Sequence, residues 1–320
     1  MIFKSFDQLF DNNNENGTKK IVAVMAAEDK HTLEAVSKAV KAGVADAILI
    51  GDKAIISRQL ELLDERLSDY EIVPAENTQD IVLRAAQFVN VGQAHFLMKG
   101  LIQTSEMMKT LLSEKSGFRT DTMMSHLSLV QIPKYHKLIG ITDAALSIYP
   151  DIKQKKDILI NAVKAMLRMG FDVPKVALLA AVDQVNPKMQ ETVDAVELKK
   201  MNAEGLLPYC IIEGPLSYDL VMSREAAVLK GIDSPVCGDA DLMVVPNLTA
   251  GNILLKALRY SAGATSAGIV LGGKAPLVLT SRAAEVANKY LPILLAAAAC
   301  HSIEKNSPGI HDGNSKPHSI

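Results

Sequence analysis

The sequence has 320 residues, of which 48% are hydrophobic and 22% are charged, so the chain can bury a substantial core. Its formal net charge of −2 disfavours a general nucleic-acid-binding protein, because such proteins need a basic excess. The three dispersed cysteines lack metal-ligand spacing, the N-terminus lacks a secretory signal pattern, and the longest apolar run is too short for a membrane span. We therefore expect a cytoplasmic protein with free thiols and no membrane partner.

Short apolar strands alternate with helical patterns in the first part of the chain. Residues 20–26 form an apolar, partly β-branched run that predicts a buried strand, and residues 33–40 follow with helical spacing. A second strand at 47–50 completes a βαβ unit, which favours parallel strands. Asn77 is placed to cap a helix that runs to residue 91, and the next strand is expected at 95–98.

The same alternation continues to the C-terminus. A helix is expected at 105–113, followed by an irregular stretch, and two further helices are expected at 152–169 and 282–300. Further strands are expected at 138–142, 176–182, 209–212, 242–245, 267–271 and 277–279. This order of elements predicts an open α/β architecture.

A break at Tyr149-Pro150-Asp151 and the position of the last helix indicate two domains. We expect a discontinuous first α/β domain made of residues 1–137 plus 282–305, and a second α/β domain made of residues 138–281. Residues 306–320 are rich in Ser, Pro, Gly, Asn and His, which predicts a disordered tail.

Polar side chains follow several predicted strands, where ligands bind in open α/β sheets. Ser281 and Arg282 stand between a strand and a helix, where unpaired N–H groups and the helix dipole favour phosphate and the guanidinium can hold two of its oxygens. A capping hydroxyl beside a solvated arginine is the simpler explanation of the same pair.

Two further strand ends carry candidate ligand-binding residues. Asn247, Thr249 and Asn252 follow one strand and offer hydrogen-bond donors, although helix capping alone explains the first two. Lys99 ends another strand and is suited to a phosphate as a point charge, or is simply a surface lysine.

Other motifs carry less information. Lys274 follows two glycines, but the segment lacks the remaining residues of a P-loop, and no GxGxxG follows the first strand. His126 is a candidate acid or base, although a hydrogen-bonded structural histidine is the more common case. Asp239 and Asp241 suggest a metal site, but no third ligand is evident, so turn or cap roles are preferred.

Several segments together resemble the phosphate acetyl/butyryltransferase family. The longest is SPVCGDADLMVVPNLTAGN within residues 217–256, supported by ITDA at 141–144, VDQVNPKMQETVDA at 182–195 and LTSR at 279–282. The resemblance extends over the whole chain except the C-terminal tail. MKGLIQTSEMMK, TDAALSIYPD and VLGGKAPLVLTSR are more similar to the butyryl branch than to the acetyl branch.

The resemblance implies two α/β/α domains of isocitrate dehydrogenase-like architecture, with the active site in the cleft between them. It implies a homodimer or larger homo-oligomer that needs no cofactor and interconverts butyryl-CoA and phosphate with butyryl phosphate and CoA. Ser281 would then hydrogen-bond the reacting oxygen and Arg282 would neutralise phosphate. The remaining substrate-binding candidates in this family frame are Lys99, Thr142, Asp143, Asn247, Thr249, Asn252 and Lys274.

The sequence also departs from the acetyl branch. That branch is taken to use an aspartate one to two turns after the Ser-Arg pair to deprotonate the CoA thiol, and Asn288 stands here instead. No arginine occurs near residues 106–109, where the acetyl branch has a ligand-binding one. Glu285 lies nearby, but a turn of the helix would point it to solvent. Either another base is used, or CoA arrives as the thiolate assisted by Lys or Arg, and the base is unassigned.

Three other interpretations remain open at this stage. Acetyl transfer would need only a different acyl pocket, because a methylene changes transition-state binding by about 1–3 kcal/mol. A metal- and NAD-dependent dehydrogenase of the same architecture would need a cluster of metal ligands. A non-catalytic acyl-CoA-binding protein is disfavoured by the Ser281-Arg282 pair.

Overall fold

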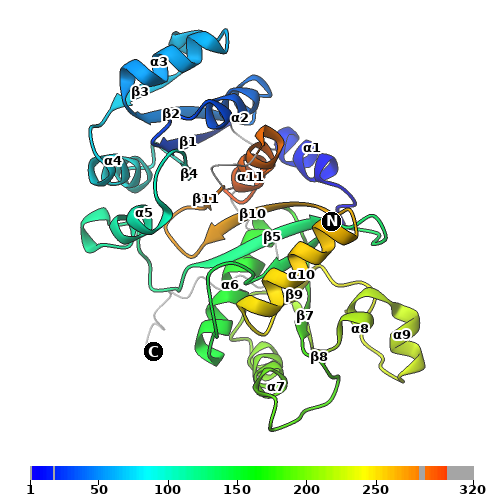
Figure 1. Cartoon of the computed structure of the whole chain (residues 1–320). Coiled ribbons are helices and arrows are strands. Elements are labelled where there is room, and N and C mark those ends of the chain that lie inside the picture. The colour runs from blue at the N-terminus through cyan, green and yellow to red at the C-terminus, as the bar shows by residue number, and fades with distance from the viewer. Residues whose placement is uncertain (1, 17–18, 281–284, 301–320) are drawn as a thin grey trace, which may run out of the picture.

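One twisted sheet organises the structure, a computed structural model that describes residues 2–16, 19–280 and 285–300 (Figure 1). The described strands form one sheet in the order β3-β2-β1-β4-β11-β10-β5-β6-β9-β7-β8. Their bounds are β1 Lys20–Met25, β2 Ala45–Gly51, β3 Glu71–Pro74, β4 Phe96–Lys99, β5 Ser125–Gln131, β6 Ile139–Thr142, β7 Lys175–Leu179, β8 Ile211–Leu216, β9 Leu242–Val244, β10 Thr265–Leu271 and β11 Leu277–Val278. The α/β prediction is confirmed.

Helices cover both faces of this sheet. They are α1 Phe6–Asn16, α2 Lys30–Lys41, α3 Lys53–Leu62, α4 Thr78–Asn90, α5 Thr104–Leu111, α6 Ile152–Arg168, α7 Gln190–Ala203, α8 Tyr218–Met222, α9 Arg224–Leu229, α10 Leu248–Ser261 and α11 Val286–Ala298, with short 3-10 turns at Leu67–Asp69 and Glu114–Ser116. Within the described ranges, no helix combines the length and apolarity that a bilayer crossing requires.

The predicted elements are largely found, and several were missed. The cap predicted at Asn77 is confirmed, since its side chain accepts a hydrogen bond from the first turn of α4. Asp151, at the predicted break, caps α6 in the same way. Helix α1 and strand β3 were not predicted, and the stretch expected to be irregular contains β5. The strand expected at 209–212 lies later, as β8. The division into two domains stays a prediction, and the tail predicted at 306–320 lies outside the described residues.

Antiparallel strands interrupt the parallel pairing in the middle of the sheet. Strands β3, β2, β1, β4 and β11 are mutually parallel, as are β6, β9, β7 and β8. Between these two sets, β10 is antiparallel to β11 and to β5, and β5 is antiparallel to β6. The carboxyl ends of β6 and β9 therefore lie together at one edge of the sheet, beside the beginning of β5.

The hydrophobic core differs between the two faces of the sheet. On one face, a single cluster extends across the strands and includes apolar residues of α1, α2, α6, α7 and α11. On the other face there are two clusters, one with α4 and α5 and one with α8, α9 and α10. The central strands β5 and β10 lie between these two clusters.

Side chains along β5 alternate between the two faces of the sheet, and this decides which of them lie on the face with two separate clusters. Leu127 and Leu129 belong to the continuous core, so His126 and Ser128 point to the opposite face. Gly268 of β10 pairs with Ser128, and a Cβ there would come within 2.5 Å of His126 Nε2. We call His126, Ser128 and Gly268 the central strip.

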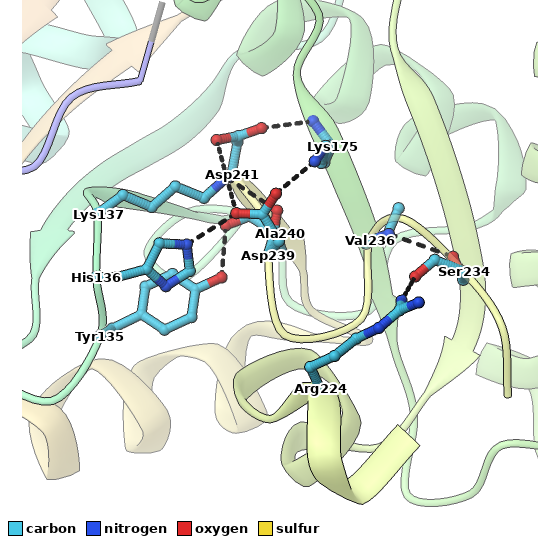
Figure 2. A network of polar contacts seen from close by, with 10 residues as sticks. All are labelled: Tyr135, His136, Lys137, Lys175, Arg224, Ser234, Val236, Asp239, Ala240 and Asp241. Carbon is cyan, nitrogen blue, oxygen red and sulfur yellow. Dashed lines mark hydrogen bonds and ion pairs between the residues drawn. The ribbon is translucent and has the colours of Figure 1, made fainter. Parts of the chain in front are cut away.

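A network of ion pairs joins the amino ends of β6, β9 and β7 (Figure 2). The Lys137 ammonium group is 1% exposed and lies 2.8 Å from Asp239 Oδ1 and 2.7 Å from Asp241 Oδ1. Asp241 Oδ2 also accepts a hydrogen bond from the Lys175 backbone N–H. Asp239 and Asp241 therefore form ion pairs with lysine side chains. No group of three or more metal-binding side chains occurs among the residues that the structure describes.

Replacing the buried lysine should destabilise the fold. Lys137→Ala leaves two carboxylates without their shared cation, and breaking a buried pair costs about 3–5 kcal/mol, so we expect a loss of about 3 kcal/mol. Urea unfolding measures this free energy. Lys134→Ala, at an exposed position nearby, should change it by less than about 0.5 kcal/mol. Equal effects of the two substitutions would contradict the role of the network.

The same network predicts acid sensitivity. Burial alone would raise the pKa of Asp239, but hydrogen bonds from Lys137, Lys175 and His136 outweigh burial and hold the pKa well below its usual range. The charged carboxylate therefore stabilises the fold above its unfolded pKa of about 3.9, and this stability is lost as the pH falls toward the folded pKa. In thermal unfolding from about pH 5 to pH 2, wild type should lose more stability than Asp239→Asn; parallel curves would refute this.

Candidate functional site

A cavity with a volume of approximately 950 Å³ lies beside α5 and the beginning of α6. Its walls come from α5, from the segment that leads into β5, and from the loop between β6 and α6 together with the first turns of α6. Its lining comprises Met108, Leu112, Arg119, Thr120, Asp121, Thr122, Met123, Met124, Leu146, Ser147, Ile148, Tyr149, Pro150, Asp151, Lys153, Gln154, Asp157 and Gly272. The volume is in the range of small-molecule sites, and exposed cations stand beside exposed apolar groups.

Asp143 shapes the loop that lines the cavity. Its side chain is buried, with Oδ1 accepting hydrogen bonds from the N–H groups of Ala145 (2.9 Å) and Leu146 (3.0 Å). Its Oδ2 accepts a hydrogen bond from the Ser147 hydroxyl at 2.9 Å. Because Leu146 and Ser147 line the cavity, Asp143 fixes the wall from behind.

Thr142 is fully buried just before this loop. Its hydroxyl donates a hydrogen bond to the His126 backbone oxygen at 2.8 Å, so it joins the end of β6 to the beginning of β5. The structure therefore places Thr142 and Asp143 behind the cavity wall, where they hold the residues in front of them.

The beginning of α10 packs against the same loop. Asn247 Oδ1 accepts a hydrogen bond from the Ala250 N–H at 3.0 Å, so Asn247 caps the helix as the simpler interpretation predicted. A Cβ on Gly251 would come within 3.0 Å of Ala144 Cα, which explains why glycine is needed at this contact. Asn252 Nδ2 donates to Ala144 O at 3.4 Å, whereas Thr249 is exposed.

The two lysines predicted to bind substrate lie in different surroundings. Lys99 is 4% exposed and its ammonium group donates to Gly100 O at 3.2 Å, so the surface-lysine interpretation is wrong. Lys274 is exposed and donates to Asn90 Oδ1 at 2.9 Å. Neither lysine lines the described cavity.

A glycine pair lets the cavity wall approach the end of β10. Gly272 has a φ of +94°, and a Cβ there would come within 2.5 Å of Met123 O. A Cβ on Gly273 would come within 2.2 Å of the Phe118 ring. Side chains at either position would push residues 118–124 away, so the Gly-Gly sequence has a packing role that the P-loop comparison did not identify.

His126 has an unusual environment in the central strip. Its Nδ1 is buried without a hydrogen-bond partner, so the hydrogen-bonded structural histidine is not what is found. Burial lowers the pKa of the ring, and the nearby Asp143 charge opposes this effect. Among the described residues, the other buried polar side-chain atom without a partner is Thr280 Oγ1.

Ser281 and Arg282 lie outside the described residues, so their roles stay predictions. Sequence reasoning missed Arg119 and Lys153, two exposed cations on opposite walls of the cavity. A basic residue in an irregular stretch gives no signal of its own. Recognising the strand at β5 would have been needed to bring the preceding segment to the cavity.

Comparison with known proteins identifies related enzymes. The family model described as "Phosphate acetyl/butaryl transferase" matches residues 71–297. The chain is 40% identical over 297 residues to phosphate butyryltransferase of Clostridium acetobutylicum, covering 92% of this chain and 98% of that protein. It is 41% identical over 283 residues to phosphate acetyltransferase of Thermotoga maritima, covering 88% of this chain and 95% of that protein.

Solved structures agree with this relationship. A branched-chain phosphotransacylase from Enterococcus faecalis V583 superposes with a TM-score of 0.77 at 30% identity, covering 88% of this chain and 99% of that one. A 4-hydroxythreonine-4-phosphate dehydrogenase from Burkholderia phymatum has a TM-score of 0.55 at 12% identity, covering 89% and 99%, which shows that the fold is shared with a dehydrogenase. The chain is therefore an acyltransferase that belongs to the phosphate acetyl/butyryltransferase family.

Proposed function

We propose that this protein is a phosphate butyryltransferase, which reversibly converts butyryl-CoA and phosphate into butyryl phosphate and CoA. The observation that carries the proposal is the 40% identity to the Clostridium acetobutylicum enzyme over 98% of that enzyme's length. A second butyryltransferase, from Clostridium beijerinckii, is 40% identical over 97% of its length. The cavity of approximately 950 Å³ is large enough for a small-molecule substrate.

The proposed reaction needs little covalent participation by the protein. Phosphate attacks the thioester carbonyl in one direction, and the CoA sulfur attacks the acyl phosphate in the other. Negative charge gathers on the carbonyl oxygen and on phosphate, so the site must supply donors and a cation. We assign the donor role to Ser281 and the phosphate-binding role to Arg282. Holding both reactants in one ternary complex removes much of the entropic barrier.

The other predicted residues support this arrangement in our proposal. Asn247, Thr249 and Asn252 contribute the α10 side of the substrate site, and Lys99 and Lys274 contribute positive charge. Asp143 and Thr142 keep the cavity wall in place through the hydrogen bonds described above. Arg119 and Lys153 add exposed positive charge at the cavity, which suits the phosphates of CoA.

The second candidate substrate is acetyl-CoA. It is favoured by the 41% identity to the Thermotoga maritima acetyltransferase, a value as high as those of the butyryltransferases. A hydrophobic pocket distinguishes acyl chains by only about 1–3 kcal/mol per methylene, so both thioesters are expected to react to some extent. The likeness to a dehydrogenase at 12% identity concerns the fold alone.

We further propose that the enzyme is cytoplasmic, acts as a homodimer or larger homo-oligomer, and uses no cofactor beyond its substrates. The two-domain division with the active site in the cleft belongs to the same proposal. Light scattering on the purified protein measures the subunit number directly. A monomer in solution would overturn the oligomer proposal without affecting the activity.

Substrate choice is measured by thiol release. Purified protein is incubated with phosphate and butyryl-CoA, acetyl-CoA or isobutyryl-CoA, and free CoA is followed with a thiol reagent. We expect phosphate-dependent release with the highest kcat/KM for butyryl-CoA, because the butyryl branch shares more of its motifs with this chain. A higher value for acetyl-CoA would move the protein to the acetyl branch. No release from any thioester would refute the proposed function.

The Ser-Arg pair is tested by single substitutions. Ser281→Ala and Arg282→Ala should each lower kcat by about a hundredfold or more, since each removes a group that stabilises charge in the transition state. Arg259→Ala, at an exposed position on α10, is the matched control and should retain wild-type kcat. Near-normal rates in folded Ser281→Ala and Arg282→Ala would remove both residues from the mechanism.

A further inference from the structure

We propose that His126 is the catalytic base that takes the proton from the CoA thiol when butyryl phosphate is the acyl donor. This inference rests on the proposed function and supplies the group that the chain needs at that step. The acetyl branch is taken to use an aspartate after its Ser-Arg pair, and this chain has Asn288 in that place. A neutral amide does not accept a thiol proton, and the nearby carboxylate of Glu285 is exposed.

His126 lies beside the hydrophobic core of the divided face, since its pairing partner Val270 belongs to the α4–α5 cluster. Its neighbours on the strand, Leu127 and Leu129, lie in the continuous core, but His126 faces the side where the core is divided into two clusters. Met124 precedes it by two residues and lines the cavity. His126 itself is not among the residues that line this cavity.

The ring of His126 has no partner that fixes its role. Nδ1 is buried without a hydrogen-bond partner. Leaving a buried polar atom unpaired costs about 1–3 kcal/mol, so a purely structural histidine at this position would be a net loss. Gly268 leaves the ring space that any side chain would fill, since a Cβ would come within 2.5 Å of Nε2.

A second unpaired atom points to the same conclusion. Thr280 immediately precedes Ser281, and its Oγ1 is also buried without a hydrogen-bond partner. The two such atoms in the described chain thus fall in segments that carry a candidate base and a candidate oxyanion donor. A bound substrate that supplies a polar partner to each segment would account for both atoms.

Asp143 gives His126 the electrostatic support that a base requires. Burial lowers the pKa of the ring, so the resting imidazole is neutral at neutral pH and can accept a proton. The Asp143 charge acts in the opposite direction and stabilises the imidazolium once it forms. The two oxygens of Asp143 already accept three hydrogen bonds from Ala145, Leu146 and Ser147, so they are engaged in holding the loop.

The proposed step is balanced in protons and electron pairs. A ring nitrogen of His126 takes the thiol proton while the sulfur forms a bond to the acyl carbon. The bond between the acyl carbon and the phosphate oxygen then breaks, and its electron pair leaves on phosphate. The imidazolium returns its proton to the departing phosphate, and the products are butyryl-CoA and inorganic phosphate. In the reverse direction the imidazolium protonates the CoA thiolate as it leaves.

The test follows thioester formation from butyryl phosphate and CoA at neutral pH. His126→Ala should lower kcat by about a hundredfold or more, with a smaller change in the KM for CoA. Added imidazole should raise the kcat of His126→Ala at least tenfold, because it supplies a base in the vacated space. Pyrazole, a ring of the same size that is almost non-basic, should not. His31→Ala, at an exposed position on α2, is the matched control and should behave as wild type.

The outcomes separate this inference from the proposed function. An inactive wild type would overturn both, whereas an active wild type with near-normal kcat in folded His126→Ala or His126→Gln would overturn the base alone. Equal effects of imidazole and pyrazole, or a loss that neither ring relieves, would also overturn the base and leave a structural role. The size-matched His126→Gln provides the kcat comparison should the alanine variant fail to fold.

Discussion

The division of one face of the sheet into two hydrophobic clusters is the constraint on which the rest of the structure depends. A single core covers the opposite face without interruption, so the sheet is held together from that side. On the divided face, β5 contributes Val130 to one cluster and β10 contributes Val270 to the other, and the positions between them are free of this requirement. Alternation along β5 then permits His126 and Ser128 where Leu127 and Leu129 would be required on the other side. Polar side chains therefore lie in the middle of the sheet, while the core on the opposite face stays continuous.

Stability and ligand binding are placed at opposite ends of the same parallel strands. Lys137 and its two aspartates join the amino ends of β6, β9 and β7. Asp143 and Asn247 follow the carboxyl ends of β6 and β9, and there they organise backbone N–H groups of a loop and a helix. Because the charged network is a strand length away from the cavity wall, its substitution is expected to change the free energy of unfolding far more than the chemistry at the site.

Local signals in the sequence predicted much of the fold, and signals that depend on distant contacts did not. The cap at Asn77 and the apolar strands were predicted correctly because each depends on a few neighbouring residues. Helix α1 was missed because its sequence, FDQLFDNNNEN, has few apolar positions and many asparagines. Strand β3 has only four residues, and β5 lies in a segment without clear boundaries, where its polar side chains concealed it.

The candidate site was predictable at the strand ends and not across the cavity. Thr142, Asp143 and Asn252 follow strands directly, and the structure brings them to one loop. Arg119 and Lys153 meet the same cavity from segments whose approach depends on the Gly272-Gly273 pair and on the first turn of α6. No spacing in the sequence connects these segments, because three-dimensional packing alone brings them together.

A histidine is chemically well suited to replace the aspartate that this chain lacks. A thiol has a pKa of about 8.5 and a carboxylate one of about 3.9, so proton transfer to an ordinary aspartate is strongly uphill. Imidazole, with a pKa of about 6.5, is a closer match, and general-base catalysis is most efficient when the pKa of the base lies near the working pH. Burial moves the pKa of His126 downward, and Asp143 limits that shift through its charge. The balance of these two effects keeps the ring neutral before the reaction and able to hold the proton during it. Asn288 is therefore compatible with an active enzyme of this family.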